Sequence, residues 1–111
     1  MRVAIAALLV LYAAGAAAVP RAKSAEECMI YADLALVAST FAKHGIARDQ
    51  AERMLPDMYE IGTPDAVEIA QRIVESAYEL LRVEPKMFSR ALVNTCVSRG
   101  GAMDAILGVK L

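Results

Sequence analysis

Few residues of this sequence have the type and spacing of a catalytic site. Nucleophilic catalysis needs a serine or cysteine beside an oriented base, and the single histidine, His44, stands directly before Gly45. That place is the predicted end of a helix, where a surface residue or a cation that favours the helix C-terminus is expected. No Gly-x-Ser-x-Gly motif and no glycine-rich phosphate loop occurs in the chain. The sequence therefore predicts no nucleophilic site.

Carboxylates are the remaining candidates for catalysis. Glu75 and Glu79 stand one helical turn apart, but on a face predicted to be exposed, whereas catalytic carboxyl groups are usually tuned by burial. Asp33 is the one acid inside a mostly apolar helix. We expect it on a narrow exposed strip beside Thr40; a hydrogen bond to a neighbouring helix is the alternative. A carboxylate-dependent hydrolase of cell-wall glycans thus lacks a visible site, and we expect that the protein is not an enzyme.

The two cysteines, Cys28 and Cys96, both lie in the part of the chain that is predicted to be exported. In an oxidising compartment such a lone pair usually forms a disulfide. A zinc site needs more ligands than one histidine and two distant cysteines, so no metal or other cofactor is expected. A bridge requires Cα atoms within about 7 Å, which predicts antiparallel packing of the first and last helices. Two buried free thiols are the alternative.

Residues 1–18 have the pattern of a secretory signal peptide. Arg2 is followed by the apolar run Val3–Val19, of 17 residues, and small residues precede the expected cut after Ala18. Cleavage after Ser24 is the alternative. This pattern predicts a secreted or periplasmic protein, without stable membrane insertion once the signal is removed.

The remaining chain is expected to comprise a short linker, 19–24, and a single domain, 25–111. It carries 11 Lys and Arg against 13 Asp and Glu, a net charge of −2. This balance gives no reason to expect a nucleic-acid partner. A chain of this size can bury one modest core.

The element around which the domain is organised is the helix predicted for Ser24–His44. Ser24 and Glu27 have the spacing of a capping box, Lys43 suits the C-terminal end, and Gly45 can close the helix. The helix is apolar on nearly all sides, which is typical of a central core helix. Its apolar residues form two adjacent stripes: Ile30, Leu34, Val37 and Phe41, and Cys28, Tyr31, Ala32, Ala35 and Ala42.

Three further helices are predicted near 47–61, 64–82 and 85–99, which gives an all-α, disulfide-linked bundle of about four helices. In the first of them, Pro56 predicts a kink or break near Leu55. The next is expected to turn an inner face toward the core that includes Tyr78 and Leu81, and the last a face that includes Met87. The apolar tail, 102–111, is expected either to form one helical turn or to stay loose.

Three residues of the second helix form a candidate interaction surface, besides the surplus apolar surface of the first helix. Met54, Met58 and Tyr59 could line a groove. Methionine stripes more often fill gaps in a core, so core packing is the preferred interpretation for the two methionines.

One cysteine lies in the first helix, in EECMIYAD, and the second lies in the last helix, in PKMFSRALVNTC. This layout of the chain resembles in outline that of periplasmic acid-stress chaperones. The linking sequences do not match, so the similarity is one of architecture. Secreted immunity proteins that inhibit cell-wall amidases are another small, helical, disulfide-bearing class, but their extra cysteines and glycine-rich motif are missing here. The interpretation that we prefer is an exported, non-catalytic module that binds a protein partner or a second copy of itself.

Overall fold

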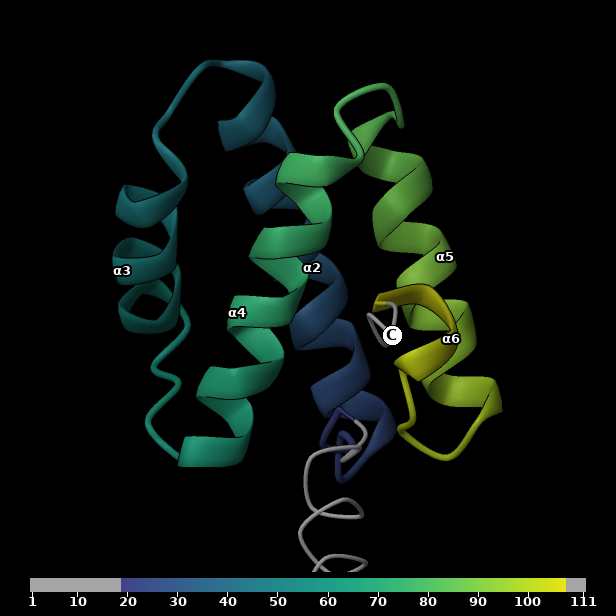
Figure 1. The fold of residues 1–111 in the computed structure, drawn as a ribbon. Coiled ribbons are helices and arrows are strands. Elements are labelled where there is room, and N and C mark those ends of the chain that lie inside the picture. The colour runs from purple at the N-terminus through teal and green to yellow at the C-terminus, as the bar shows by residue number, and fades with distance from the viewer. Residues whose placement is uncertain (1–18, 108–111) are drawn as a thin grey trace, which may run out of the picture.

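The computed structural model describes residues 19–107, which form five α-helices and contain no β-strand. Figure 1 shows α2 behind α4, with α3 and α5 on either side and the short α6 near the C-terminal end of the described chain. The predicted all-α fold with four principal helices is confirmed. The predicted signal peptide and residues 108–111 lie outside the described part. The helices are α2 (Ala25–Lys43), α3 (Arg48–Met58), α4 (Pro64–Glu79), α5 (Pro85–Ser98) and α6 (Asp104–Leu107).

Helix α2 begins and ends where its capping residues predict. The Ser24 hydroxyl accepts a hydrogen bond from the amide of Glu27 at 3.1 Å, and the Glu27 carboxylate accepts one from the amide of Lys23 at 3.0 Å. The return bond therefore reaches one residue further back than in the usual capping box. At the other end His44 is the C-cap, and Gly45 follows with φ of 75°, a conformation that glycine adopts without a steric penalty.

The core is built around α2, which packs mainly against α5 and α4 and less against α3. Its fully buried residues include Leu34, Ala35 and Ala38, and the small side chains let the neighbouring helices come close. The predicted stripes are buried only in part. Ile30 remains 40% exposed, while Val37 and Phe41 are half-buried at the edge of the core.

Helix α3 does not break at Leu55. It continues through Pro56, which lacks only its own N–H donor, and ends two residues later at Met58. The amide of Tyr59 still donates to the carbonyl of Leu55, at 3.2 Å. Core packing of both methionines was the wrong expectation: Met54 is 37% and Met58 54% exposed, because α3 lies at the periphery and buries mainly Ala51 and Leu55.

Helix α4 begins as predicted and ends three residues early. The Thr63 hydroxyl accepts from the amide of Ala66 at 3.3 Å, and Pro64 occupies the first turn. The helix stops at Glu79 with Leu80 as its C-cap, and the chain turns before Pro85 begins α5. Two apolar residues near this turn were expected to face inward and are exposed instead: Leu81 at 53% and Met87 at 61%.

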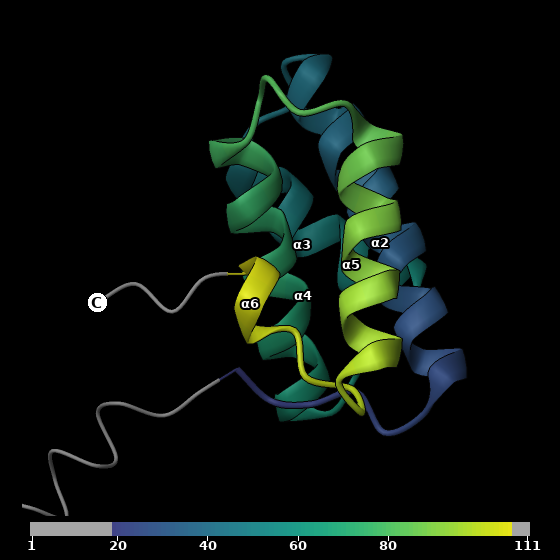
Figure 2. The same cartoon turned by 90° about the vertical axis from the view of Figure 1, so that its right-hand side faces the viewer.

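The predicted pairing of the cysteines is confirmed in geometry. The sulfur atoms of Cys28 and Cys96 lie 2.08 Å apart and their Cα atoms 5.7 Å apart. The pair joins the beginning of α2 to the end of α5, so these two helices run antiparallel, side by side (Figure 2). A second tie is the Ser89 hydroxyl, which donates to the carbonyl of Ala32 at 2.7 Å.

Residues 19–24, expected to be a linker, are part of the packed fold; we call them the N-terminal strap. The side chains of Val19 and Ala22 are each only 4% exposed. The amide of Ala22 donates to the carbonyl of Gly101 at 2.9 Å, and the amide of Val19 donates to Asp104 Oδ1 at 3.1 Å. The C-terminal tail also packs back, with Met103 fully buried. The first and last described segments thus hold each other against the bundle.

Candidate functional site

A recess that combines charged and aromatic residues lies near the N-terminal end of α2, and we call it the α2–α4 groove. Its volume is about 220 Å³. Four segments meet there: the N-terminal strap, α2, the loop between α3 and α4, and the first turns of α4. The lining residues are Arg21, Lys23, Glu27, Ile30, Tyr31, Tyr59, Glu60, Ile61, Gly62, Thr63, Asp65, Ala66 and Ile69.

The groove contains buried and half-buried apolar side chains. Tyr31 and Ile69 are almost completely buried, Ile61 is half-buried and Ile30 is exposed. Burial and, to a smaller extent, the negative charges of Glu27 and Asp65 together raise the pKa of the Tyr31 phenol from 10.0 to about 12. Tyr31 is therefore a neutral hydroxyl at physiological pH. It can donate or accept a hydrogen bond but does not supply an anion.

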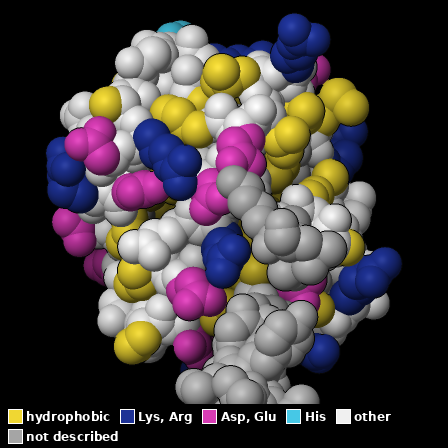
Figure 3. All heavy atoms as spheres, in the orientation of Figure 1, with side chains coloured by type: hydrophobic (Ala, Val, Ile, Leu, Met, Phe, Trp, Pro, Cys, Tyr) yellow, Lys and Arg dark blue, Asp and Glu magenta, His cyan; other side chains and the backbone are white. Residues whose placement is uncertain are grey.

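Charges of both signs stand around the groove, and they come from different segments. Arg21 and Lys23 are exposed on the strap, whereas Glu60 and Asp65 are exposed on the α3–α4 loop and on α4. The same mixture occurs on the face over α3 and α4 that Figure 3 draws, where acidic and basic side chains lie near one another with hydrophobic side chains between them. This pattern offers a partner apolar contact together with two kinds of ion pair.

Two hydrogen bonds tie the residues that follow α3 to their surroundings. The Tyr59 hydroxyl donates to the carboxylate of Asp33, and the amide of Ile61 donates to the carbonyl of Pro56 at 2.8 Å. Burial and then the Asp33 hydrogen bond raise the pKa of Tyr59 well above its ordinary value. Glu60 has φ of 54°, a left-handed conformation that costs a residue with a side chain about 1–2 kcal/mol. A strained residue held by its neighbours is the kind of feature that collects at binding sites.

The structure separates the three residues of the candidate interaction surface predicted from sequence. Tyr59 lines the α2–α4 groove, while Met54 and Met58 are exposed on α3 and are not among its lining residues. Asp33 is exposed, as expected, and also makes the alternative hydrogen bond to the end of a neighbouring helix. Sequence reasoning did not find Tyr31 as a groove residue, because its place in an apolar stripe signals only burial.

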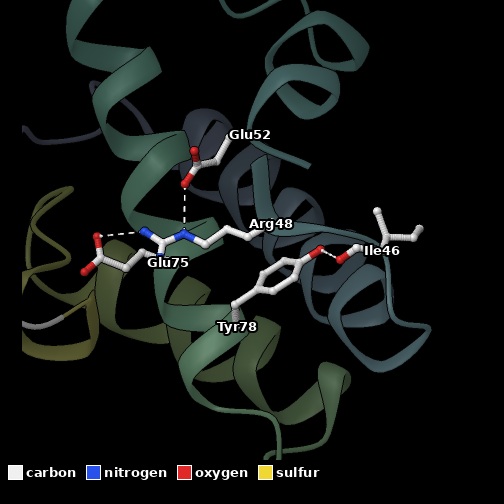
Figure 4. A network of polar contacts seen from close by, with 5 residues as sticks. All are labelled: Ile46, Arg48, Glu52, Glu75 and Tyr78. Atoms are coloured by element: carbon white, nitrogen blue, oxygen red, sulfur yellow. Dashed lines mark hydrogen bonds and ion pairs between the residues drawn. The ribbon is translucent and has the colours of Figure 1, made fainter. Parts of the chain in front are cut away.

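A second group of polar residues ties α3 to α4 (Figure 4). Arg48 Nε donates to Glu52 at 2.9 Å, and Arg48 Nη2 lies 3.6 Å from the carboxylate of Glu75. Beside it the Tyr78 hydroxyl donates to the carbonyl of Ile46 at 2.6 Å. Glu75, considered above as half of a carboxylate pair, therefore takes part in a link between helices.

Two further properties concern residues 19–107 alone. No group of three or more His, Cys, Asp or Glu side chains in this range could hold a metal ion. Likewise, no helix in this range is both long enough and apolar enough to cross a bilayer.

No protein-family model, curated protein or solved structure matches this chain.

Proposed function

We propose that the protein is an exported, non-catalytic binding module that docks a segment of a protein partner in the α2–α4 groove. The observation that carries the proposal is an apolar groove bordered by charges of both signs and built from four segments of the chain. Protein interfaces commonly combine an apolar centre with a polar rim, and Tyr and Arg are enriched among the residues that contribute most binding energy.

The volume of the groove favours a protein segment over a small metabolite. Pockets for drug-sized ligands usually measure about 300–1,000 Å³, and the groove, at about 220 Å³, is smaller. It has room for one or two side chains that project from a larger surface. The occupant that fits is an apolar side chain flanked by an acidic and a basic residue, which would face Arg21 or Lys23 and Glu60 or Asp65.

Export is supported by the signal-peptide pattern of residues 1–18 and by the two cysteines at disulfide distance. The partner is accordingly expected in the periplasm or outside the cell. A second copy of the same chain is the other occupant to be tested, by light scattering of the purified protein.

The test compares two aspartate substitutions of exposed apolar residues. Ile30→Asp places a charge in the groove, whereas Met87→Asp makes the same kind of change on α5, away from the groove lining. Both side chains are exposed, so both variants are expected to keep the wild-type circular dichroism spectrum. Proteins cross-linked to the wild type in the intact envelope should be lost with Ile30→Asp and retained with Met87→Asp.

Two results would contradict the proposal. One is an unchanged set of cross-linked proteins for Ile30→Asp. The other is a strict monomer that cross-links to nothing in the envelope of cells that produce it.

A further inference from the structure

The N-terminal strap makes closer contacts with the rest of the fold than a linker requires. Gly101 has φ of 96°, and a Cβ atom built on it would lie 2.0 Å from the carbonyl oxygen of Ala22, which no real side chain could tolerate. The Ala22 amide bonds to the carbonyl of the same glycine at 2.9 Å. This close approach of two backbones fixes where the strap runs, independently of any charge.

At its N-terminal end, the strap contacts the carboxylate group of Asp104. The nitrogen of Val19 lies 3.1 Å from Asp104 Oδ1, and the Val19 side chain is 4% exposed. In the uncleaved chain this nitrogen belongs to a neutral peptide group. Asp104 then accepts a single hydrogen bond from an uncharged donor.

We propose that Asp104 is the docking site for the α-ammonium group of Val19, which is created when the chain is cut after Ala18. In that hydrolysis water breaks the Ala18–Val19 peptide bond: Ala18 leaves as a carboxylate, and the Val19 amine takes up the proton. An α-amino group has an ordinary pKa of about 7.7–8.0 and is therefore largely charged at neutral pH. The neutral contact thereby becomes an ion pair, and charge-assisted hydrogen bonds are roughly twice as strong as neutral ones.

The same contacts distinguish between the two cleavage sites that the sequence allows. A cut after Ser24 would remove Val19 and Ala22 from the core and leave Asp104 without the strap. A cut after Ala18 keeps every described contact and adds a charge where an acceptor already stands. The inference rests on the proposed export, and it is independent of the groove and its partner.

The test uses the full chain with its own leader, produced as wild type, Asp104→Asn and the control Asp57→Asn. Asparagine keeps the shape and an acceptor oxygen but removes the charge of Asp104. Asp57 is an exposed acid on α3. Intact mass of the protein recovered from the envelope should show Val19 as the first residue in all three.

The reactivity of the new amine then reports the ion pair. Only the uncharged amine reacts with an acylating reagent, so an ion pair that raises the amine pKa by one unit slows acylation at neutral pH by about tenfold. We expect slow acylation in the wild type and in Asp57→Asn, and acylation about tenfold faster in Asp104→Asn. The amine pKa obtained from the pH dependence of the rate should fall accordingly in that variant.

A chain that begins at any residue other than Val19 would overturn the proposal, as would equal acylation rates in the wild type and Asp104→Asn. If Asp104→Asn fails to fold, the wild type still decides, because the amine pKa obtained from the pH dependence of the rate must be higher in the folded protein than in the protein unfolded in urea, whereas burial alone would lower it. A protected amine in a protein without a binding partner would refute the groove alone. A partner bound at the groove of a protein with an unprotected amine would refute the ion pair alone.

Discussion

At the scale of single residues, Glu60 shows most clearly that the backbone near the α2–α4 groove is strained. Its left-handed backbone places a residue with a Cβ where glycine is normally preferred, next to Tyr59, whose hydroxyl bonds to Asp33. The neighbours of Glu60, and not its own preference, therefore determine the shape of the loop.

Replacing Glu60 with glycine should relieve this strain. We expect Glu60→Gly to raise the free energy of unfolding by about 1 kcal/mol, measured by urea denaturation. Glu68→Gly, in the interior of α4, is the matched control and should lower it by about 1 kcal/mol. A loss of stability in Glu60→Gly would show that the side chain contributes more than its backbone conformation costs.

The sequence contains no signal that identifies Glu60 as a strained residue of the groove. Glu60 is one acid among 13 acidic residues, and its conformation follows from the way α3 and α4 are joined. The burial of Tyr31 could be predicted from its apolar stripe, but that it lines one groove with Arg21 and Glu60 depends on how distant segments pack. The pairing of Cys28 with Cys96, by contrast, could be predicted, because these are the two cysteines that the sequence contains.

Tyr31 makes the stability depend on pH in the alkaline range. Its pKa is raised to about 12 in the fold from an ordinary value of 10.0, so between these values the unfolded chain has lost a proton that the folded chain keeps. The stabilisation is complete below pH 10 and is lost as the pH rises toward 12. Tyrosinate absorbance should show one phenol of the wild type titrating near pH 12 that is missing in Tyr31→Phe. Identical titration curves for the two proteins would contradict the burial of this hydroxyl.

At the scale of elements, α2 determines how the other helices are placed. Its capping residues and apolar pattern could be predicted because they are local. The ends of α3 and α4 could not, since they depend on how far each helix reaches over its neighbours. In the sequence, Leu81 and Met87 continue the helical spacing of apolar residues. In the structure they lie near the α4–α5 turn, beyond the core that would bury them.

Truncation of two residues on α2 should separate the centre of the core from its edge. Leu34→Ala is expected to cost about 2–5 kcal/mol of unfolding free energy, because Leu34 is fully buried and the change leaves a cavity. Phe41→Ala should cost less than Leu34→Ala, although it removes more atoms, because Phe41 is half-buried. Chemical denaturation of both variants is the measurement. A larger loss for Phe41→Ala would move the centre of the core toward the C-terminal end of α2.

At the scale of the whole molecule, the pair Cys28–Cys96 closes a loop with a sequence separation of 68. For a loop of this size the chain-entropy argument gives a stabilisation of about 4 kcal/mol, a large share of the 5–15 kcal/mol typical of native proteins. Thiol labelling of protein taken directly from the envelope and denatured should modify neither cysteine without reductant and both after reduction. Labelling of both without reductant would contradict the bridge.

At the same scale, we propose that the α2–α4 groove contacts a protein partner after export. A photo-reactive amino acid at Ile61, a half-buried groove residue, would report that contact in living cells. The matched position is Val97 on α5, which is 51% exposed and outside the groove lining. We expect a discrete cross-linked protein from Ile61, absent from Val97 and lost when Ile30→Asp is added. Equal cross-linking from the two positions, or none from Ile61, would contradict the groove as the binding site.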